Sequence, residues 1–113
     1  MDAPGYTYRA VITNVYDGDT VTADIDLGLS VGVHGEKLRL HRINAPEVRG
    51  EERPAGLLSR DWLRGRVLGK SVIIQTIKDR KGKYGRYLAE IWLEGQNVND
   101  QIVEADHAEY KAY

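Results

Sequence analysis

The stretch from Val21 to Leu27 constrains the fold most, because apolar and polar residues alternate along it without a break. Successive side chains of a β-strand point to opposite faces, so this alternation predicts a half-buried strand with Asp24 and Asp26 facing solvent. The stretch Tyr6–Tyr16 before it is rich in β-branched and aromatic residues and predicts another strand. Asp17-Gly18-Asp19 between them has the composition of a tight turn, so the two strands are expected to form a hairpin.

The remaining sequence predicts three more strands and two helices. The strands are expected at Leu38–His41, Val72–Ile77 and Tyr87–Leu93, with residues 79–86 as a basic connection. Glycines are expected to break residues 28–35 into a loop or an irregular edge. One helix is expected to begin at Pro54 and stop at Gly69, and a second to begin near Asn97. The first helix is expected to bury a face made of Ala55, Leu58 and Trp62, with Leu63 and Val67 beside it.

This order of elements predicts an α+β fold. Three strands, a helix, two strands and a closing helix match a five-stranded OB-fold β-barrel with a helix between strands 3 and 4 and a C-terminal helix. Periodicity alone leaves other small α+β arrangements open. The 113 residues are expected to form a single domain, residues 1–113, in which residues 1–5 are flexible.

Composition excludes several classes of protein. The chain has no cysteine, which excludes disulfide scaffolds, thiolate zinc sites and cysteine nucleophiles. No apolar run approaches the roughly 20 residues of a membrane span, so no membrane partner is expected. The first residues lack the pattern of a secretory signal, so we expect a cytoplasmic protein, or a secreted one if a leader has been removed.

Charge is unevenly distributed although the formal net charge is only −1. Between Lys37 and Arg86 there are 14 Lys and Arg against five Asp and Glu, whereas the remainder has two against 12. A basic middle segment suits a polyanionic partner, although two solvated faces of opposite charge would give the same counts. Charge alone therefore does not identify the partner.

Three connections carry residues suited to chemistry: Asp17-Gly18-Asp19-Thr20, the segment from Leu38-Arg39-Leu40 to Asn44-Ala45-Pro46-Glu47, and Lys83-Tyr84-Gly85-Arg86. Each has an ordinary structural explanation when taken alone, as a hairpin turn, a salt bridge or a polar loop. Together, in this order and at this spacing, they resemble the staphylococcal nuclease-like (thermonuclease) family. The resemblance extends from about Thr7 to Ala108. It implies an OB-fold barrel and metal-dependent hydrolysis of phosphodiester bonds in DNA and RNA that leaves 3′-phosphate ends.

The resemblance also implies roles for individual residues. Asp19, Asn44 and the backbone carbonyl of Ala45 would bind Ca²⁺ directly, and Asp17 would act in the outer shell through water. Glu47 would be the general base, and Arg39 and Arg86 would clamp the phosphate. The residues that would contact substrate are Lys83, Tyr84 and either Tyr110 or Tyr113, a tyrosine that could stack on a base.

The chemistry of these residue types is consistent with that mechanism. Planar guanidinium groups match phosphate oxygens and stabilise the charge that grows on them in the transition state. The two aspartates, Glu47 and the two arginines sum to −1, and a bound Ca²⁺ makes the sum +1, so the metal is expected to be required before phosphate is attracted.

Asn44 departs from the family, which has a carboxylate at this position. An amide oxygen can still coordinate Ca²⁺, but the lost charge predicts weak binding, with a dissociation constant of about 10⁻⁴–10⁻³ M. We therefore expect a calcium-dependent nuclease acting on DNA and RNA, with single strands preferred. The alternative is a catalytically silent OB-fold module that binds single-stranded nucleic acid or a protein partner.

Overall fold

The computed structural model describes residues 6–81 and 85–111. The expected flexibility of residues 1–5 and the roles expected for Lys83, Tyr84 and Tyr113 lie outside these residues. The strands are β1 (Thr7–Asp17), β2 (Thr20–Gly28), β3 (Val31–Leu40), β4 (Ile43–Asn44), β5 (Ser71–Lys81), β6 (Tyr87–Leu93), β7 (Gln96–Asn97) and β8 (Glu109–Tyr110). The helices are α1 (Arg53–Val67) and α2 (Val98–Glu104), and a 3₁₀ turn, η1 (Gly50–Glu52), precedes α1.

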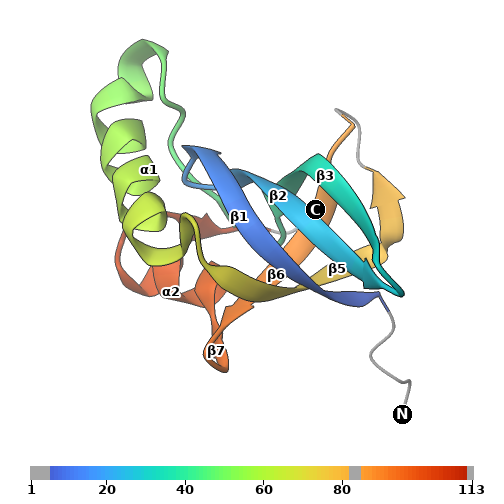
Figure 1. Cartoon of the computed structure of the whole chain (residues 1–113). Helices are drawn as coiled ribbons and strands as arrows, with labels where there is room; N and C mark the ends of the chain where they lie inside the picture. The colour runs from blue at the N-terminus through green and yellow to red at the C-terminus, as the bar shows by residue number, and fades with distance from the viewer. Residues whose placement is uncertain (1–5, 82–84, 112–113) are drawn as a thin grey trace.

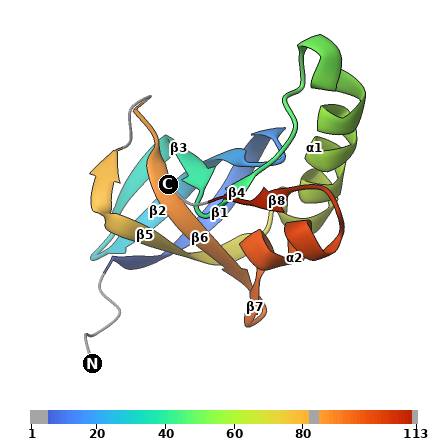
Figure 2. The ribbon, with the colours of Figure 1, turned by 180° about the vertical axis from the view of Figure 1, so that it is seen from behind.

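Five of these strands close into a barrel, which confirms the predicted OB-fold (Figure 1). The strands β3, β2, β1, β5 and β6 pair in that order with antiparallel neighbours, and β6 then pairs in parallel with β3. Seen from behind in Figure 2, α2 and the short β4–β8 pair lie at one end of the barrel, with α1 alongside. Closure through β3 and β6 brings residues 49 positions apart in the chain into register.

The alternation in β2 places its side chains as predicted up to Asp26, whereas Leu27 at its end is 45% exposed. Val21 and Ala23 are fully buried and Ile25 is nearly so, whereas Asp24 and Asp26 lie toward solvent. Each aspartate accepts a hydrogen bond from a glycine backbone N–H of the β2–β3 hairpin. In β3, Leu38 and Leu40 point into the core, so Arg39 between them is directed to the outside of the barrel.

The structure corrects the predicted extent of two strands and adds a pairing. β3 begins at Val31, because the glycine-containing stretch pairs with β2 from Gly28↔Val31 onward. Of the two expected alternatives, a loop is wrong, and the irregular edge agrees with the register shifts of this pairing. β5 continues to Lys81, beyond the predicted start of the connection. The β4–β8 pair was not predicted, since a two-residue strand has no periodic signal.

The buried face of α1 also differs from the prediction. Leu58 is 63% exposed, whereas the buried residues of α1 are Gly56, Ser59, Leu63 and Val67. The reason is close packing: a Cβ on Gly56 would lie 2.0 Å from the carbonyl oxygen of Glu47. Small residues are therefore required where α1 touches the segment after β4.

The second helix begins as expected. The Asn97 side chain accepts a hydrogen bond from the Asp100 backbone N–H at 2.9 Å, which caps α2. Within the described part of the chain, neither helix combines the length and the apolar character needed to cross a membrane.

Candidate active site

The turn between β1 and β2 is held in place by its glycine. A Cβ on Gly18 would lie 2.7 Å from the Ala45 Cβ and 2.8 Å from the Ser59 Cβ, so only glycine fits without displacing its neighbours. The turn therefore packs directly against the segment after β4 and against α1. Within it, the Asp19 backbone N–H donates to Asp17 Oδ1 at 3.1 Å, which fixes one aspartate relative to the other.

Asp19 connects the first two of the predicted motifs. Its side chain is buried, and Oδ2 accepts a hydrogen bond from the Ala45 backbone N–H at 2.8 Å. The same oxygen lies 3.3 Å from Arg39 Nη1. A buried carboxylate with a charged partner and a backbone donor has a well-defined position. The Asp19 carboxylate thus joins the β1–β2 turn to β3 and to the segment after β4.

Arg39 is fixed by further contacts. Its side chain is 13% exposed, and Nη1 donates to the carbonyl oxygens of Leu40 and Ile43 at 3.0 and 3.1 Å. Nη2 donates to Asn44 Oδ1 at 3.4 Å. The guanidinium is therefore held rigidly at the end of β3.

Arg86, from the third motif, reaches the same cluster through Thr20. Arg86 Nη1 donates to Thr20 Oγ1 at 3.2 Å, and Thr20 Oγ1 donates to Asp19 Oδ1 at 3.2 Å. The parallel pairing of β3 with β6 explains this convergence, because Arg39 is opposite Leu88, two residues after Arg86. Arg39 and Arg86, distant in sequence, are thus linked through Asp19 and Thr20.

A cavity of about 300 Å³ opens beside this cluster. Asp17, Glu47 and Arg86 line it, together with Tyr16, Val48 and Arg49. Glu47 is exposed, and its backbone rests on Gly56 of α1, which sets where its side chain projects. The three predicted connections therefore meet around one cavity.

Burial and charge act together on Asp17. Burial, then the negative charge of Asp19 and its hydrogen bond, raise the pKa of Asp17 to about 7. A cation bound beside these two carboxylates would favour the ionised form of Asp17 and lower its pKa again. The donor set therefore fits a cation. No cluster of three or more His, Cys, Asp or Glu side chains suited to a metal is found within residues 6–81 and 85–111, so carbonyl and water oxygens would have to complete the coordination.

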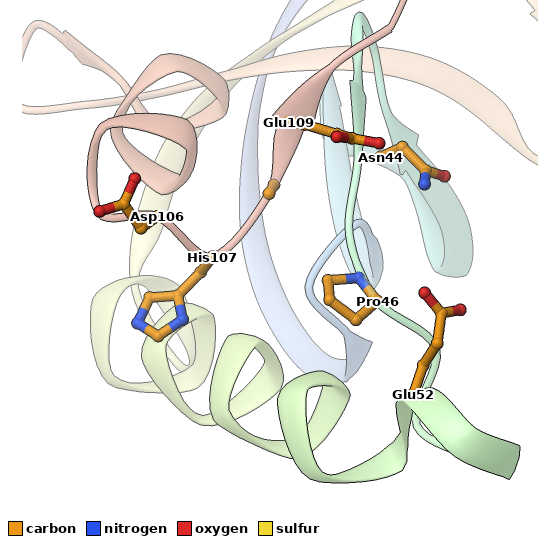
Figure 3. A pocket seen from close by; sticks show the side chains of 7 residues that line it. Asn44, Pro46, Glu52, Asp106, His107 and Glu109 are labelled. Atoms are coloured by element: carbon orange, nitrogen blue, oxygen red, sulfur yellow. The ribbon is translucent and has the colours of Figure 1, made fainter.

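Asn44 lies between the cluster and a separate cavity. Its amide oxygen accepts a hydrogen bond from Arg39. Its side chain also lines a cavity of about 290 Å³ on the side of β4 that faces β8 (Figure 3). Figure 3 shows Glu109 directed toward Asn44, while Glu52 projects from below near Pro46. Asn44 does not line the cavity that contains Asp17 and Glu47.

Tyr110 contacts α2 and Arg42. Its hydroxyl donates to Asp100 Oδ1 at 2.9 Å, and the guanidinium of Arg42 lies 5.8 Å from the centre of its ring. It lines neither the cavity of Asp17 and Glu47 nor that of Figure 3. Its contact with a base stays a prediction.

Neither Tyr16 nor Arg49 is among the site residues expected from the sequence. Both line the cavity of Asp17 and Glu47, and Arg49 Nη2 donates to the Tyr16 hydroxyl at 3.1 Å. The β1–β2 register shifts between Val15 and Asp17, so Tyr16 lies at a β-bulge. A bulge redirects a side chain but does not change the hydrophobic pattern of the sequence. No signal in this one sequence could therefore have identified Tyr16 as a cavity residue.

The closed barrel, with two arginines and two buried or half-buried aspartates gathered at the end of β3, defines an OB-fold domain with a charged surface cleft. Comparison with known families assigns this domain to one of them. Residues 37–113 match the family described as "Staphylococcal nuclease homologue", and the chain belongs to this family.

Two curated relatives are thermonucleases. The thermonuclease of Staphylococcus hyicus is 27% identical over 110 residues, covering 95% of this chain and 60% of the relative. The thermonuclease of Staphylococcus intermedius is 27% identical over 115 residues, covering 99% of this chain and 64% of the relative. The chain thus spans about three fifths of the length of these relatives.

Proposed function

We propose that this protein is a calcium-dependent nuclease that hydrolyses phosphodiester bonds in DNA and RNA. The observation that carries the proposal is the single cavity lined by Asp17, Glu47 and Arg86, beside a cluster that also holds Arg39. Membership in the staphylococcal nuclease homologue family and the names of the two relatives support the same activity.

The arginines would bind the scissile phosphate. Arg86 lines the cavity, and Arg39 is held at the end of β3 by the Asp19 carboxylate and two backbone carbonyls. Because these groups are positioned before substrate arrives, they stabilise the charge that develops on the phosphoryl oxygens more than they stabilise the ground state. Removal of one such donor typically lowers kcat by about 10²–10³-fold.

Glu47 would accept the proton of the attacking water. The water oxygen forms a bond to phosphorus, its proton passes to the Glu47 carboxylate, and the bond from phosphorus to the 5′ oxygen breaks. The electron pair leaves with the 5′ oxygen, which takes a proton from solvent, and the product keeps a 3′-phosphate. Exposure of Glu47 at the cavity leaves its carboxylate accessible to such a water. General-base assistance of this kind contributes about 10²–10⁴-fold.

Asp19, Asp17, the Ala45 carbonyl and Asn44 are the residues that would hold Ca²⁺. When bound, the ion neutralises phosphate charge and polarises water in the site. The half-buried Asp17 beside Asp19 is the feature that such an ion would stabilise most. Because Asn44 is neutral and is bonded to Arg39, we expect weak binding, with a dissociation constant of about 10⁻⁴–10⁻³ M.

The hydrogen bond from Arg39 to the Asn44 amide oxygen occupies an oxygen that would otherwise bind the metal. It therefore also favours the alternative function, a catalytically silent module that binds single-stranded nucleic acid or a protein partner. One experiment separates the two. Heat-denatured DNA is incubated with the protein in millimolar CaCl₂, alongside an EDTA lane and the Glu47→Gln variant. Calcium-dependent degradation that Glu47→Gln abolishes, with 3′-phosphate products, supports the nuclease. Intact DNA that is retarded on a gel with or without calcium supports the binding module.

A further inference from the structure

A larger cavity of about 430 Å³ adjoins the proposed active site and is lined by residues of β1, β2 and β3. It shares Tyr16, Arg49 and Arg86 with the cavity that contains Glu47. The remaining residues that line it are Asn14, Thr20, Thr22 and Lys37. Three of the seven lining residues are cationic and none is acidic, so the cavity attracts anions.

The polar residues of this face form an ordered row. Asn14 is opposite Thr22, and Thr22 is opposite Lys37, so the three lie side by side across β1, β2 and β3. Lys37 and Arg39 are two residues apart on β3 and therefore project from the same face, about 7 Å apart. This separation is comparable with that of neighbouring phosphates in an extended strand of nucleic acid.

Tyr16 lies at the boundary between the two cavities. Its side chain is 48% exposed, and the bulge between Val15 and Asp17 directs it away from the core. The hydrogen bond from Arg49 to its hydroxyl keeps the ring in place and sets a guanidinium at its edge. An exposed aromatic ring with a cation at its edge, in a cavity that Lys37 and Arg86 also line, is an arrangement on which proteins stack bases of single strands.

We propose that Tyr16, Arg49 and Lys37 form a second nucleotide subsite, which binds the nucleotide beyond the two that the cleaved bond joins. The base stacks on Tyr16, and the flanking phosphates contact Arg49 and Lys37. The inference rests on the proposed function, because it assumes that the scissile phosphate binds at Arg86. A polyanion without bases, such as an acidic peptide, would satisfy the cations but would not use the ring.

The test is binding of fluorescein-labelled oligothymidylates of two to ten nucleotides to the full chain carrying Glu47→Gln, in CaCl₂. Tyr16→Ala should weaken binding of the longer strands about tenfold and leave the dinucleotide within about twofold. Tyr16→Phe keeps the ring and should stay close to the parent protein. The matched control is Tyr6→Ala, since Tyr6 is 49% exposed and lines none of these cavities.

Two further measurements separate stacking from charge. On a strand of the same length made of abasic nucleotides, the Tyr16→Ala effect should disappear. Lys37→Gln and Arg49→Gln should each reduce the slope of log Kd against log salt by about 0.7, whereas the control Lys70→Gln leaves it unchanged.

The outcomes distinguish this inference from the proposed function. If the wild-type protein cleaves DNA but Tyr16→Ala and Tyr6→Ala bind every strand equally, the subsite is refuted and the nuclease stands. If Tyr16→Ala loses the same binding affinity for abasic strands as for normal strands, stacking of a base on Tyr16 is also refuted. If no cleavage occurs but the length-dependent effect of Tyr16→Ala persists, the subsite stands and the nuclease is refuted.

Discussion

Replacing Gly56 by alanine tests whether the contact between α1 and the segment after β4 positions Glu47. The added Cβ would lie 2.0 Å from the Glu47 carbonyl oxygen, 2.5 Å from its carbonyl carbon and 2.9 Å from the Val48 nitrogen. Since real Cβ contacts are essentially never shorter than 3.0 Å, the two backbone segments must separate by about 1 Å. Displacements of this size cost about 10²-fold in rate when they move a catalytic group.

The effect of Gly56→Ala on stability should be much smaller. Overpacking costs about 1–3 kcal/mol, and alanine recovers about 1 kcal/mol of helix propensity, so we expect a net loss of about 0–2 kcal/mol. Gly65 offers a matched control in the same helix, since a Cβ there meets nothing within 4 Å. Gly65→Ala should stabilise the protein by about 0.5–1 kcal/mol and keep full activity.

The assay compares kcat/KM on a single-stranded oligonucleotide with the free energy of unfolding in urea for the parent and both variants. The expected result is a rate lowered about 100-fold in Gly56→Ala while the protein remains folded. Full activity in Gly56→Ala would refute the argument that this contact places Glu47. Activity lost only in proportion to the unfolded fraction would show that the glycine matters for stability alone.

Three further predictions concern single side chains. Asn44→Asp should tighten calcium binding about tenfold in calorimetry, and an unchanged dissociation constant would exclude Asn44 as a ligand. In EDTA, Asp17 holds a proton in the folded state that the unfolded chain releases above pH 4, so thermal stability should fall between pH 4 and 7. Asp17→Asn should flatten this dependence of stability on pH, and an identical slope in the variant would contradict the raised pKa of Asp17. Asn99 is fully buried and bonds to backbone groups of His41, Ala89 and Ile91, so Asn99→Ala should lower the free energy of unfolding by about 2–4 kcal/mol in urea titrations; a loss below 1 kcal/mol would count against these bonds.

The elements of the barrel could be predicted because each has a local signal. Alternation identifies β2, Pro54 marks the start of α1, and Asn97 caps α2. The start of β3 could not be predicted, because residues 31–35 are exposed and become a strand only through pairing with β2. The face of α1 was misjudged at Leu58 because a periodic pattern does not reveal that a neighbouring backbone requires glycine.

The candidate site could be assembled only in part. Family resemblance pointed to Arg39, Glu47 and Arg86, and the fold places them around one cluster and its cavity. The role of Thr20 as the link between Asp19 and Arg86 depends on a contact between residues 66 positions apart. Tyr16 depends on a bulge, and the direction of Asn44 depends on its bond to Arg39. Such features arise from tertiary packing and have no counterpart in a short stretch of sequence.

The parallel pairing of β3 with β6 has a consequence for how the chain acquires its proposed activity. This pairing is the last ladder needed to turn an open sheet into a closed cylinder, and the same ladder brings Arg86 to Arg39. A partly folded chain that lacks it carries the two guanidinium groups at opposite edges of an open sheet. During synthesis, the proposed active site therefore cannot form until β6 has emerged and paired with β3.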